Sequence, residues 1–303
     1  MIVDAHHHLW DPERRSYDWM SGPFAPLRVK RTVADLHAAA EPLGVTATVA
    51  VQAVPDEEET RELLAQPVTA VVGWVDLTAA DVADRIAALR AAPGGERLAG
   101  IRHQVHDEPD PEWLLRADVG RGLRAVADAG LAYDLLLFPR HLPAATTVAA
   151  AHPDLRLVLD HGAKPPIAAG GWEPWSSDLA ALARHEHVDC KLSGLVTEAL
   201  WDRWRASGIE RYAARLLEAF GPGRLLFGSD WPVCTLAASY AEVLELARSA
   251  IAGLSAAEQA AVLGGNARRV YALADGSGSS ASSTHSSTPA TWTVAQARAR
   301  SGR

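Results

Sequence analysis

The sequence contains little cysteine, no long apolar run and no block of basic residues. Of its 303 residues only Cys190 and Cys234 are cysteines. They do not form a CxxC pair, so they suit free buried thiols in a reducing compartment better than a disulfide framework. No apolar segment approaches the length that crosses a bilayer, and no signal-peptide pattern precedes Asp4. We therefore expect a cytoplasmic protein that has no membrane partner.

The charge pattern and the absence of a phosphate-binding motif narrow the class of ligand. The formal net charge is -8 and the basic residues are scattered, which argues against a nucleic-acid surface. No GxGxxG motif follows any apolar segment, so the usual dinucleotide-binding sheet is not indicated. Hydrophobic residues make up 48% of the chain and charged residues 22%, values close to those of ordinary globular proteins. A small molecule is the expected partner.

Short apolar segments alternate with helical patterns along the chain. An opening strand from Ile2 is followed by seven further segments typical of buried strands, at 46–52, 70–76, 98–103, 132–138, 156–161, 188–193 and 224–230. Apolar residues at helical spacing predict helices between and after these strands, at 32–40, 57–65, 80–91, 113–129, 142–151, 179–184, 209–220, 240–252 and 256–273. Residues 11–30 are expected to form an irregular aromatic loop of the kind that often covers a site.

Eight strand-helix units predict an α/β protein with a parallel (β/α)8 barrel of the TIM type. An open doubly wound sheet is the alternative, and the missing dinucleotide motif speaks against it. The barrel is expected to form a single domain over residues 1–274. Residues 275–303 are rich in Ser, Gly, Ala and Thr, and they contain too few apolar residues to build a core. We expect this segment to be a disordered tail.

Three consecutive histidines end the opening strand. Side chains alternate between the faces of a strand, so His6 and His8 point to one side and His7 to the other. Two imidazoles on one face can share a metal ion. The alternative is a polar strand end or the remnant of a purification tag, although tags carry longer histidine runs.

Other strands also end in polar or aromatic residues, and in a barrel these ends converge on one face. They are Gln52, Trp74, Asp76, Arg102, His103, Asp160, His161, Ser193 and Asp230. Together with His6 and His8, a third histidine and a carboxylate match the ligands of a divalent transition metal. A carboxylate beside an activated water can accept its proton and pass it to a leaving group. The sequence therefore predicts a hydrolytic site.

Simpler roles remain open for several of these residues. Asp230 precedes Trp231-Pro232 and could cap the following turn. His161 could be a core histidine that Asp160 orients. Arg102 could form an ordinary ion pair, although arginine at a strand end also suits a substrate carboxylate or hydroxyl group.

Six sequence blocks together resemble the amidohydrolase superfamily of the amidohydrolase-2 type. Within it they resemble the sugar-lactone hydrolase branch, of the L-fuconolactonase and L-rhamnono-lactonase type. The blocks are Asp4-Ala5-His6-His7-His8-Leu9-Trp10, Gly73-Trp74-Val75-Asp76-Leu77, Gly100-Ile101-Arg102-His103, Leu159-Asp160-His161-Gly162-Ala163-Lys164-Pro165-Pro166, Lys191-Leu192-Ser193-Gly194-Leu195 and Phe227-Gly228-Ser229-Asp230-Trp231-Pro232. The resemblance covers residues 2–273 and implies that the barrel is distorted.

The resemblance implies roles for the residues already collected. His6, His8, His161 and Asp230 would hold the metal, and Asp230 and His161 would act in catalysis, with Asp230 as the general base. Residues expected to contact the substrate are Arg102, Lys164, Gln52, Trp74 and Trp231. The chain has no lysine at the end of the fourth strand to bridge two metals, so one divalent ion is expected, with zinc first among the candidates and its need for catalysis left open.

The implied reaction is the opening of a sugar-acid lactone, an aldonolactone such as L-fuconolactone or L-rhamnonolactone, by water that Asp230 activates. The sugar lactone is the expected partner, and association into a homo-oligomer is left open. One rival is a metal-dependent decarboxylase of an unsaturated carboxylic acid on the same barrel. The other is a sugar-acid binding protein without catalysis, against which the complete set His6, His8, His161 and Asp230 argues.

Overall fold

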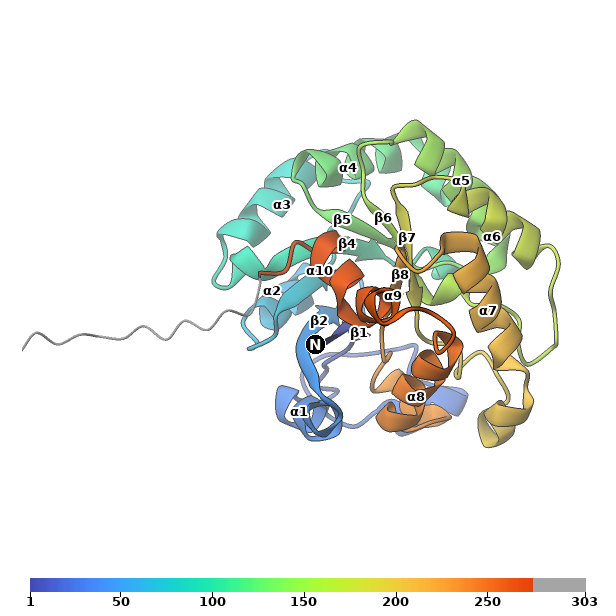
Figure 1. Ribbon diagram of the computed structural model, residues 1–303. Helices are drawn as coiled ribbons and strands as arrows, with labels where there is room; N and C mark the ends of the chain where they lie inside the picture. Colours follow the sequence, from blue (N-terminus) through green and yellow to red (C-terminus); the bar gives the residue numbers. More distant parts are fainter. Residues whose placement is uncertain (275–303) are drawn as a thin grey trace, which may run out of the picture.

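A parallel barrel forms the body of the protein. The computed structural model describes residues 1–274, in which eight strands form one sheet in the order of the chain (Figure 1). Each strand pairs in parallel with the next along the chain. The strands are β1 (Ile2–His7), β2 (Val45–Val51), β3 (Ala70–Gly73), β4 (Leu98–His103), β5 (Ala132–Leu135), β6 (Leu157–Leu159), β7 (Val188–Leu192) and β8 (Leu225–Phe227). The predicted fold class is confirmed, while the predicted tail at 275–303 lies outside the described residues.

Helices form a ring around the strands (Figure 1). They are α1 (Val33–Ala40), α2 (Glu57–Leu64), α3 (Val82–Ala91), α4 (Ala117–Asp128), α5 (Leu142–Ala151), α6 (Trp175–Ala183), α7 (Ile209–Phe220) and α8 (Tyr240–Ala250). Two short helices, α9 (Ala256–Ala260) and α10 (Asn266–Val270), follow the ring. None of the helices within residues 1–274 is long and apolar enough to cross a membrane. Cys190 and Cys234 are buried and free, as expected from their spacing.

Three helices differ clearly from the sequence prediction. The helix predicted over 179–184 begins four residues earlier, at Trp175, whose indole donates to the carbonyl of Gly162 at 2.8 Å. In the other two, tertiary contacts override the local pattern. The helix expected from 113 begins at Ala117, since the ring of Trp113 stacks on His103 at 4.3 Å and its segment forms a 3₁₀ turn. The helix expected over 256–273 is interrupted by a π-helical turn at Ala261–Gly265. A Cβ atom on Gly264 would lie 2.8 Å from the carbonyl oxygen of Met1, so this turn needs glycine where it meets β1.

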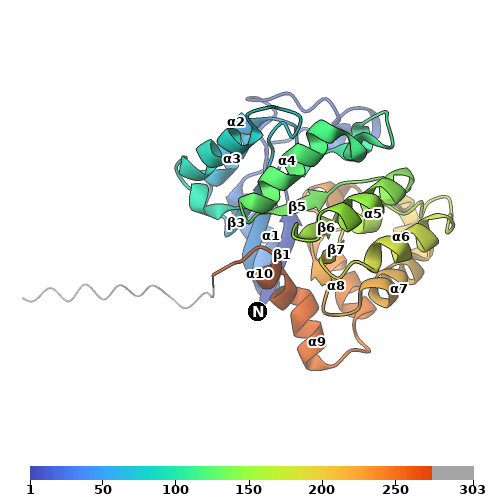
Figure 2. The same cartoon turned by 90° about the horizontal axis from the view of Figure 1, so that it is seen from above.

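The strands separate two apolar cores. Outside the barrel, Leu, Ile and Val side chains from strands and helices form the larger core. Inside it, small residues such as Ala5, Ala47 and Ala132 leave room for Val270, the last residue of α10, and for Tyr271 directly after it. Helices α9 and α10 lie at the end of the barrel where the chain begins (Figure 2). This end of the barrel is therefore plugged, and chemistry belongs at the opposite end.

Residues beyond the formal end of β8 complete the barrel against β1. The Asp230 amide donates to the carbonyl of His6 at 2.8 Å, and the His8 amide donates to that of Trp231 at 2.7 Å. Inside this seam the buried Asp4 carboxylate accepts from the Ser229 amide at 2.8 Å and from the Tyr240 hydroxyl at 2.8 Å. The seam thus fixes the backbone on both sides of the histidine pair.

Candidate active site

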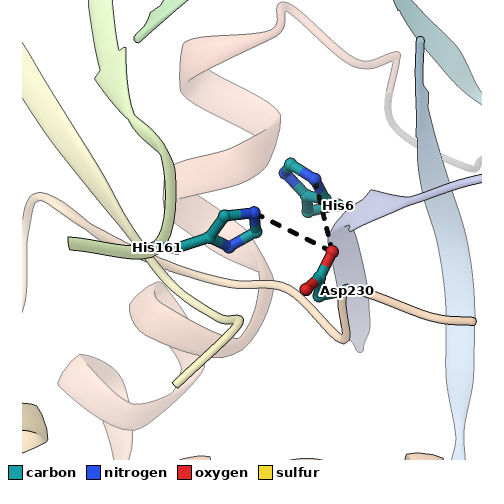
Figure 3. Close-up of side chains that lie close together, drawn as sticks. All are labelled: His6, His161 and Asp230. Carbon is teal, nitrogen blue, oxygen red and sulfur yellow. Dashed lines mark ion pairs between the residues drawn. The ribbon is translucent and has the colours of Figure 1, made fainter. Parts of the chain in front are cut away.

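His6, His161 and Asp230 meet at the C-terminal ends of β1, β6 and β8 (Figure 3). The Oδ1 atom of Asp230 lies 3.7 Å from His6 Nε2 and 3.8 Å from His161 Nε2. All three side chains are almost completely buried. The structure therefore brings three of the predicted site residues together although 224 positions separate Asp230 from His6 (230 − 6).

His8 lies beside this group, and His7 lies on the other face of the strand. The Nε2 atom of His8 is 3.2 Å from His6 Nε2 and 3.5 Å from Asp230 Oδ1. Its Nδ1 atom is 2.8 Å from the carbonyl oxygen of Val51, which can only accept a hydrogen bond, so neutral His8 carries its proton on Nδ1 and its lone pair on Nε2. Within residues 1–274, neither ring nitrogen of His7 has a hydrogen-bond partner. The predicted alternation of the three histidines holds.

An unusual backbone turn carries His161. Four consecutive residues, His161 to Lys164, have φ values of 55°, 56°, 61° and 50°, and Asp230 has a φ of 56°. Left-handed conformations cost free energy in residues other than glycine, and they gather at functional sites where the surrounding structure enforces them. Here the Ser193 hydroxyl lies 2.8 Å from His161 Nδ1 and helps to hold the ring against Asp230.

Burial and neighbouring charges set the protonation of the site. Burial by itself raises the pKa of Asp230, but the neighbouring imidazoles of His161 and His8 outweigh it, and the pKa lies below its usual value. Burial lowers the pKa of His161 to about 4. At neutral pH the site therefore combines an ionised carboxylate with a neutral imidazole, as a general base and a hydrogen-bonding partner require.

A cluster of buried charged side chains lies beneath the site, and two of its members, Asp134 and Lys191, were not predicted from the sequence. Lys191 of β7 contacts Asp134 of β5 at 2.5 Å and Asp160 at 2.9 Å, and all three are fully buried. Arg102 contacts the other oxygen of Asp160 at 2.9 Å. The Tyr271 hydroxyl donates to Asp134 at 2.8 Å from the plugged end of the barrel. Asp134 and Lys191 each stand in the middle of an apolar strand, and this position in the sequence could have indicated that they pair inside the barrel.

A family model described as Amidohydrolase matches residues 3–273. The chain belongs to the amidohydrolase family.

This amidohydrolase is similar to two L-fucono-1,5-lactonases over most of its length. It is 42% identical over 287 residues to L-fucono-1,5-lactonase of Burkholderia multivorans, covering 89% of this chain and 96% of that protein. It is 39% identical over 245 residues to L-fucono-1,5-lactonase of Burkholderia ambifaria, covering 79% and 83%. A crystal structure of an amidohydrolase from Burkholderia multivorans with bound zinc is 40% identical, with a TM-score of 0.83, covering 90% of this chain and 100% of that chain.

The residues of the site fit one divalent metal ion. One ligand atom from each of His6, His161 and Asp230 lies within 4.8 Å of the others. Imidazole nitrogen and carboxylate oxygen are common ligands of transition metals. The Nδ1 atoms of His161 and His8 contact Ser193 and Val51, so their rings are held in place and Nε2 is directed toward the site. The second nitrogen of His6 has a different neighbour, the ammonium group of Lys191 at 3.0 Å.

Two predicted substrate-binding residues, Gln52 and Arg102, are held by contacts within the protein. The Arg102 guanidinium donates to the main-chain carbonyl and to the side-chain oxygen of Gln52, the latter at 3.1 Å, besides its bond to Asp160. The Gln52 amide donates to Gln104 at 3.2 Å. These contacts leave the Arg102 Nε atom without a hydrogen-bond partner within residues 1–274. Contact of Gln52 and Arg102 with substrate stays a prediction.

The other three predicted substrate-binding residues follow β3, β6 and β8. Trp74 donates from its indole to His103 Nδ1 at 3.0 Å and remains partly exposed. Lys164, also partly exposed, pairs with Glu198 at 2.8 Å. Trp231 is buried, and the guanidinium of Arg31 lies 5.9 Å from its ring. Trp74 and Lys164 have surface that a ligand can reach, and their role in binding stays a prediction.

Two neighbouring residues of α2 hold the loops that carry Gln52 and Trp74. The Glu59 carboxylate accepts from the amides of Ala53 at 2.9 Å and Val54 at 3.0 Å. The Trp74 amide donates to the Thr60 hydroxyl at 2.8 Å. Burial raises the pKa of Glu59 to about 7, although the two amides and nearby arginines oppose it.

This raised pKa predicts a pH-dependent stability. The ordinary pKa of a glutamate side chain is 4.5, and in the folded chain the pKa of Glu59 is about 7. Between these two pH values Glu59 is protonated in the folded chain and ionised in the unfolded chain. Glu59 therefore contributes its full stabilisation, at most about 3 kcal/mol, at pH values below the unfolded-state pKa. This contribution is lost as the pH rises through the folded-state pKa. Glu59→Gln keeps a neutral group there. We expect the Tm of wild type to fall relative to that of Glu59→Gln between about pH 5 and about pH 8.

Thermal denaturation of both proteins over that pH range checks the expectation. Glu218→Gln is the control, because the Glu218 side chain is 72% exposed and its substitution should leave the pH dependence unchanged. A constant difference in Tm between wild type and Glu59→Gln would show that Glu59 does not titrate in this range.

Proposed function

We propose that this amidohydrolase opens the ring of a sugar-acid lactone, an aldonolactone of the L-fuconolactone type. The observation that carries the proposal is the ionised Asp230 carboxylate, which lies 3.5 to 3.8 Å from the Nε2 atoms of three histidines at the open end of the barrel. Two lactonases at 42% and 39% identity support the same reaction class. The decarboxylase alternative gains no support from these relatives.

The proposed reaction uses Asp230 as the base. Its carboxylate takes a proton from water as the water attacks the lactone carbonyl carbon. The imidazoles of His6 and His161 are placed to donate hydrogen bonds to the developing oxyanion, and preorganised donors of this kind typically contribute about 3 kcal/mol each. Asp230 then returns the proton to the ring oxygen as the carbon-oxygen bond breaks, which yields the open hydroxy acid.

His6, His8, His161 and Asp230 are the residues that would hold a metal ion, which we propose to be zinc. When bound, such an ion supplies Lewis-acid polarisation of a carbonyl and lowers the pKa of a coordinated water. Asp230 serves as the proton acceptor with or without it.

We also propose a cytoplasmic location, which the buried free thiols of Cys190 and Cys234 suit.

A screen of aldonolactones tests the function. Lactone opening releases acid, which a pH indicator records, and parallel assays with and without a chelator report the need for metal. We expect turnover of at least one six-carbon or 6-deoxy aldonolactone. Carbon dioxide release from an unsaturated acid without lactone opening would support the decarboxylase instead. Tight lactone binding without turnover would support a binding protein.

The position of His161 makes Gly194 a sensitive test of the site. Gly194 has a φ of +65°, and a Cβ atom there would lie 2.4 Å from His161 Nδ1. Gly194→Ala should therefore displace the imidazole, and a shift of about 1 Å in a catalytic group can lower kcat/KM about 100-fold. Gly208→Ala is the matched control, because Gly208 has a φ of +67° and nothing lies within 4 Å of its Cβ position.

Rates of lactone hydrolysis by the two purified variants distinguish the effect of backbone strain at the glycine from the effect of displacing the His161 ring. Both substitutions carry the same left-handed backbone cost, about 1 kcal/mol. Gly194→Ala adds the cost of its clash with the buried His161 ring, typically about 1–3 kcal/mol, so its Tm should fall further than that of Gly208→Ala. Only Gly194→Ala should lose activity. Equal activities of the two variants would mean that the contact between Gly194 and His161 does not position the ring.

A further inference from the structure

The ammonium group of Lys191 lies among three acceptors inside the barrel. Its Nζ atom is 2.5 Å from Asp134 Oδ2, 2.9 Å from Asp160 Oδ1 and 3.0 Å from His6 Nδ1. An ammonium group has three protons to donate and no lone pair. The contact with His6 therefore requires the lone pair of the imidazole to lie on Nδ1, and the ring proton of neutral His6 then lies on Nε2.

The histidine on the other side of His6 agrees with this assignment. His8 donates its Nδ1 proton to the Val51 carbonyl at 2.8 Å, so its Nε2 carries a lone pair. The Nε2 atoms of His8 and His6 are 3.2 Å apart, and a hydrogen bond between them needs one proton. That proton is the one that Lys191 places on His6 Nε2.

Two weaker contacts favour the opposite tautomer. Asp160 Oδ1 lies 3.3 Å from His6 Nδ1 and could accept a proton from it. Arg102 Nη1 lies 3.4 Å from His6 Nε2 and could donate to it. Both distances exceed the 3.0 Å between Lys191 and His6. Arg102 also has a closer partner, Asp160 Oδ2 at 2.9 Å. Asp160 Oδ1 forms an ion pair with Lys191 at 2.9 Å, and within residues 1–274 it accepts no hydrogen bond, from His6 or from any other group.

The tautomer decides what His6 can do in the site. A metal ion needs a lone pair on the nitrogen that faces it, and histidine ligands usually donate their other proton to a carboxylate or carbonyl group. His6 with its proton on Nε2 instead presents a hydrogen-bond donor, which His8 accepts at 3.2 Å until the developing oxyanion takes its place. Asp160 is placed to accept from Nδ1 when Lys191 does not occupy it.

We propose that Lys191 is a positioning residue that holds His6 as an Nε2–H donor and thereby weakens binding of a divalent metal at His6, His161 and Asp230. The donor role rests on the proposed function, whereas the effect on metal binding does not. Metal affinity is measured without substrate, so a protein that failed to open any lactone would still test the effect of Lys191.

Titration of the metal-free protein with Co²⁺, followed by calorimetry and by the visible spectrum of the bound ion, tests the proposal. Lys191→Met removes the ammonium group and frees His6 Nδ1 to donate to Asp160. It also leaves the buried cluster with an uncompensated negative charge, which by itself attracts a cation. The double variant Asp134→Asn/Lys191→Met removes one charge of each sign, so it isolates the effect of the tautomer and avoids the unfolding that the single variant risks.

We expect the double variant to bind Co²⁺ at least about 10-fold more tightly than wild type, the usual effect of changing a group that orients a metal-binding histidine. Lys30→Met, which alters a lysine 59% exposed, should bind as wild type does. Nitrogen NMR of histidine-labelled, metal-free wild type should place the His6 proton on Nε2. A double variant that binds Co²⁺ no more tightly than wild type, or a His6 proton on Nδ1, would overturn the proposal.

Discussion

Replacing Asp230 by Asn is expected to lower kcat for lactone opening by about 10²- to 10⁴-fold while the barrel stays folded. The amide cannot accept the proton of the attacking water, and it has no proton of the right acidity to return to the ring oxygen. The fold should tolerate the change, because Asp230 has a φ of 56° and asparagine adopts left-handed conformations more readily than most residues. Initial-rate kinetics on the lactone found in the screen provide the measurement.

A second aspartate provides the control for this variant. The Asp202 side chain is 81% exposed, so Asp202→Asn should leave both kcat and KM unchanged. Far-ultraviolet circular dichroism and the Tm verify that Asp230→Asn is folded. A folded Asp230→Asn variant with the activity of wild type would rule out Asp230 as the general base.

Breaking the buried charge cluster should cause the largest loss of stability. Lys191 and Arg102 balance Asp134 and Asp160 inside the barrel, and their side chains are at most 3% exposed. Removing one member leaves a net charge where water cannot reach it, which typically lowers the free energy of unfolding by about 3–5 kcal/mol. We expect losses of this size for Asp134→Asn and for Lys191→Met. The double variant removes both charges and should lose markedly less than the sum of the two.

Denaturant unfolding of the three variants measures this coupling. The surface pair of Lys30 and Asp11, 2.7 Å apart with the lysine 59% exposed, supplies a matched control. Lys30→Met and Asp11→Asn should each leave the free energy of unfolding nearly unchanged, because solvent screens pairs at the surface. Strictly additive losses at Asp134 and Lys191 would show that the two charges do not stabilise one another.

Sequence alone could predict the barrel because the strands are short, apolar and regularly spaced. Every predicted strand exists, although β3, β5, β6 and β8 end two or three residues earlier than expected. There the chain leaves the sheet but stays buried, as at Asp160 and His161, so its composition still resembles that of a strand. The end of a buried strand depends on hydrogen bonds to neighbours, which the local pattern does not contain.

The sequence could predict which residues form the site, but not the backbone turn and the buried charges that hold them in place. His6, His8, His161 and Asp230 follow from strand ends that converge in a barrel. The left-handed turn at His161 could not be foreseen, since Ala163 and Lys164 have no intrinsic preference for it. Lys191 and Asp134 belong to different strands, and only the pairing of the whole sheet brings their charges together.

The seam between β1 and β8 has a consequence for how the molecule is made. Asp4 leaves the ribosome long before the groups that satisfy its carboxylate, because Ser229 and Tyr240 follow 225 and 236 residues later. Contacts so distant in sequence form late, because closing a long loop costs entropy before any contact rewards it. The strand that carries His6 and His8 can therefore complete its contacts only when nearly the whole chain has been made. Lactone opening then requires the barrel to be closed.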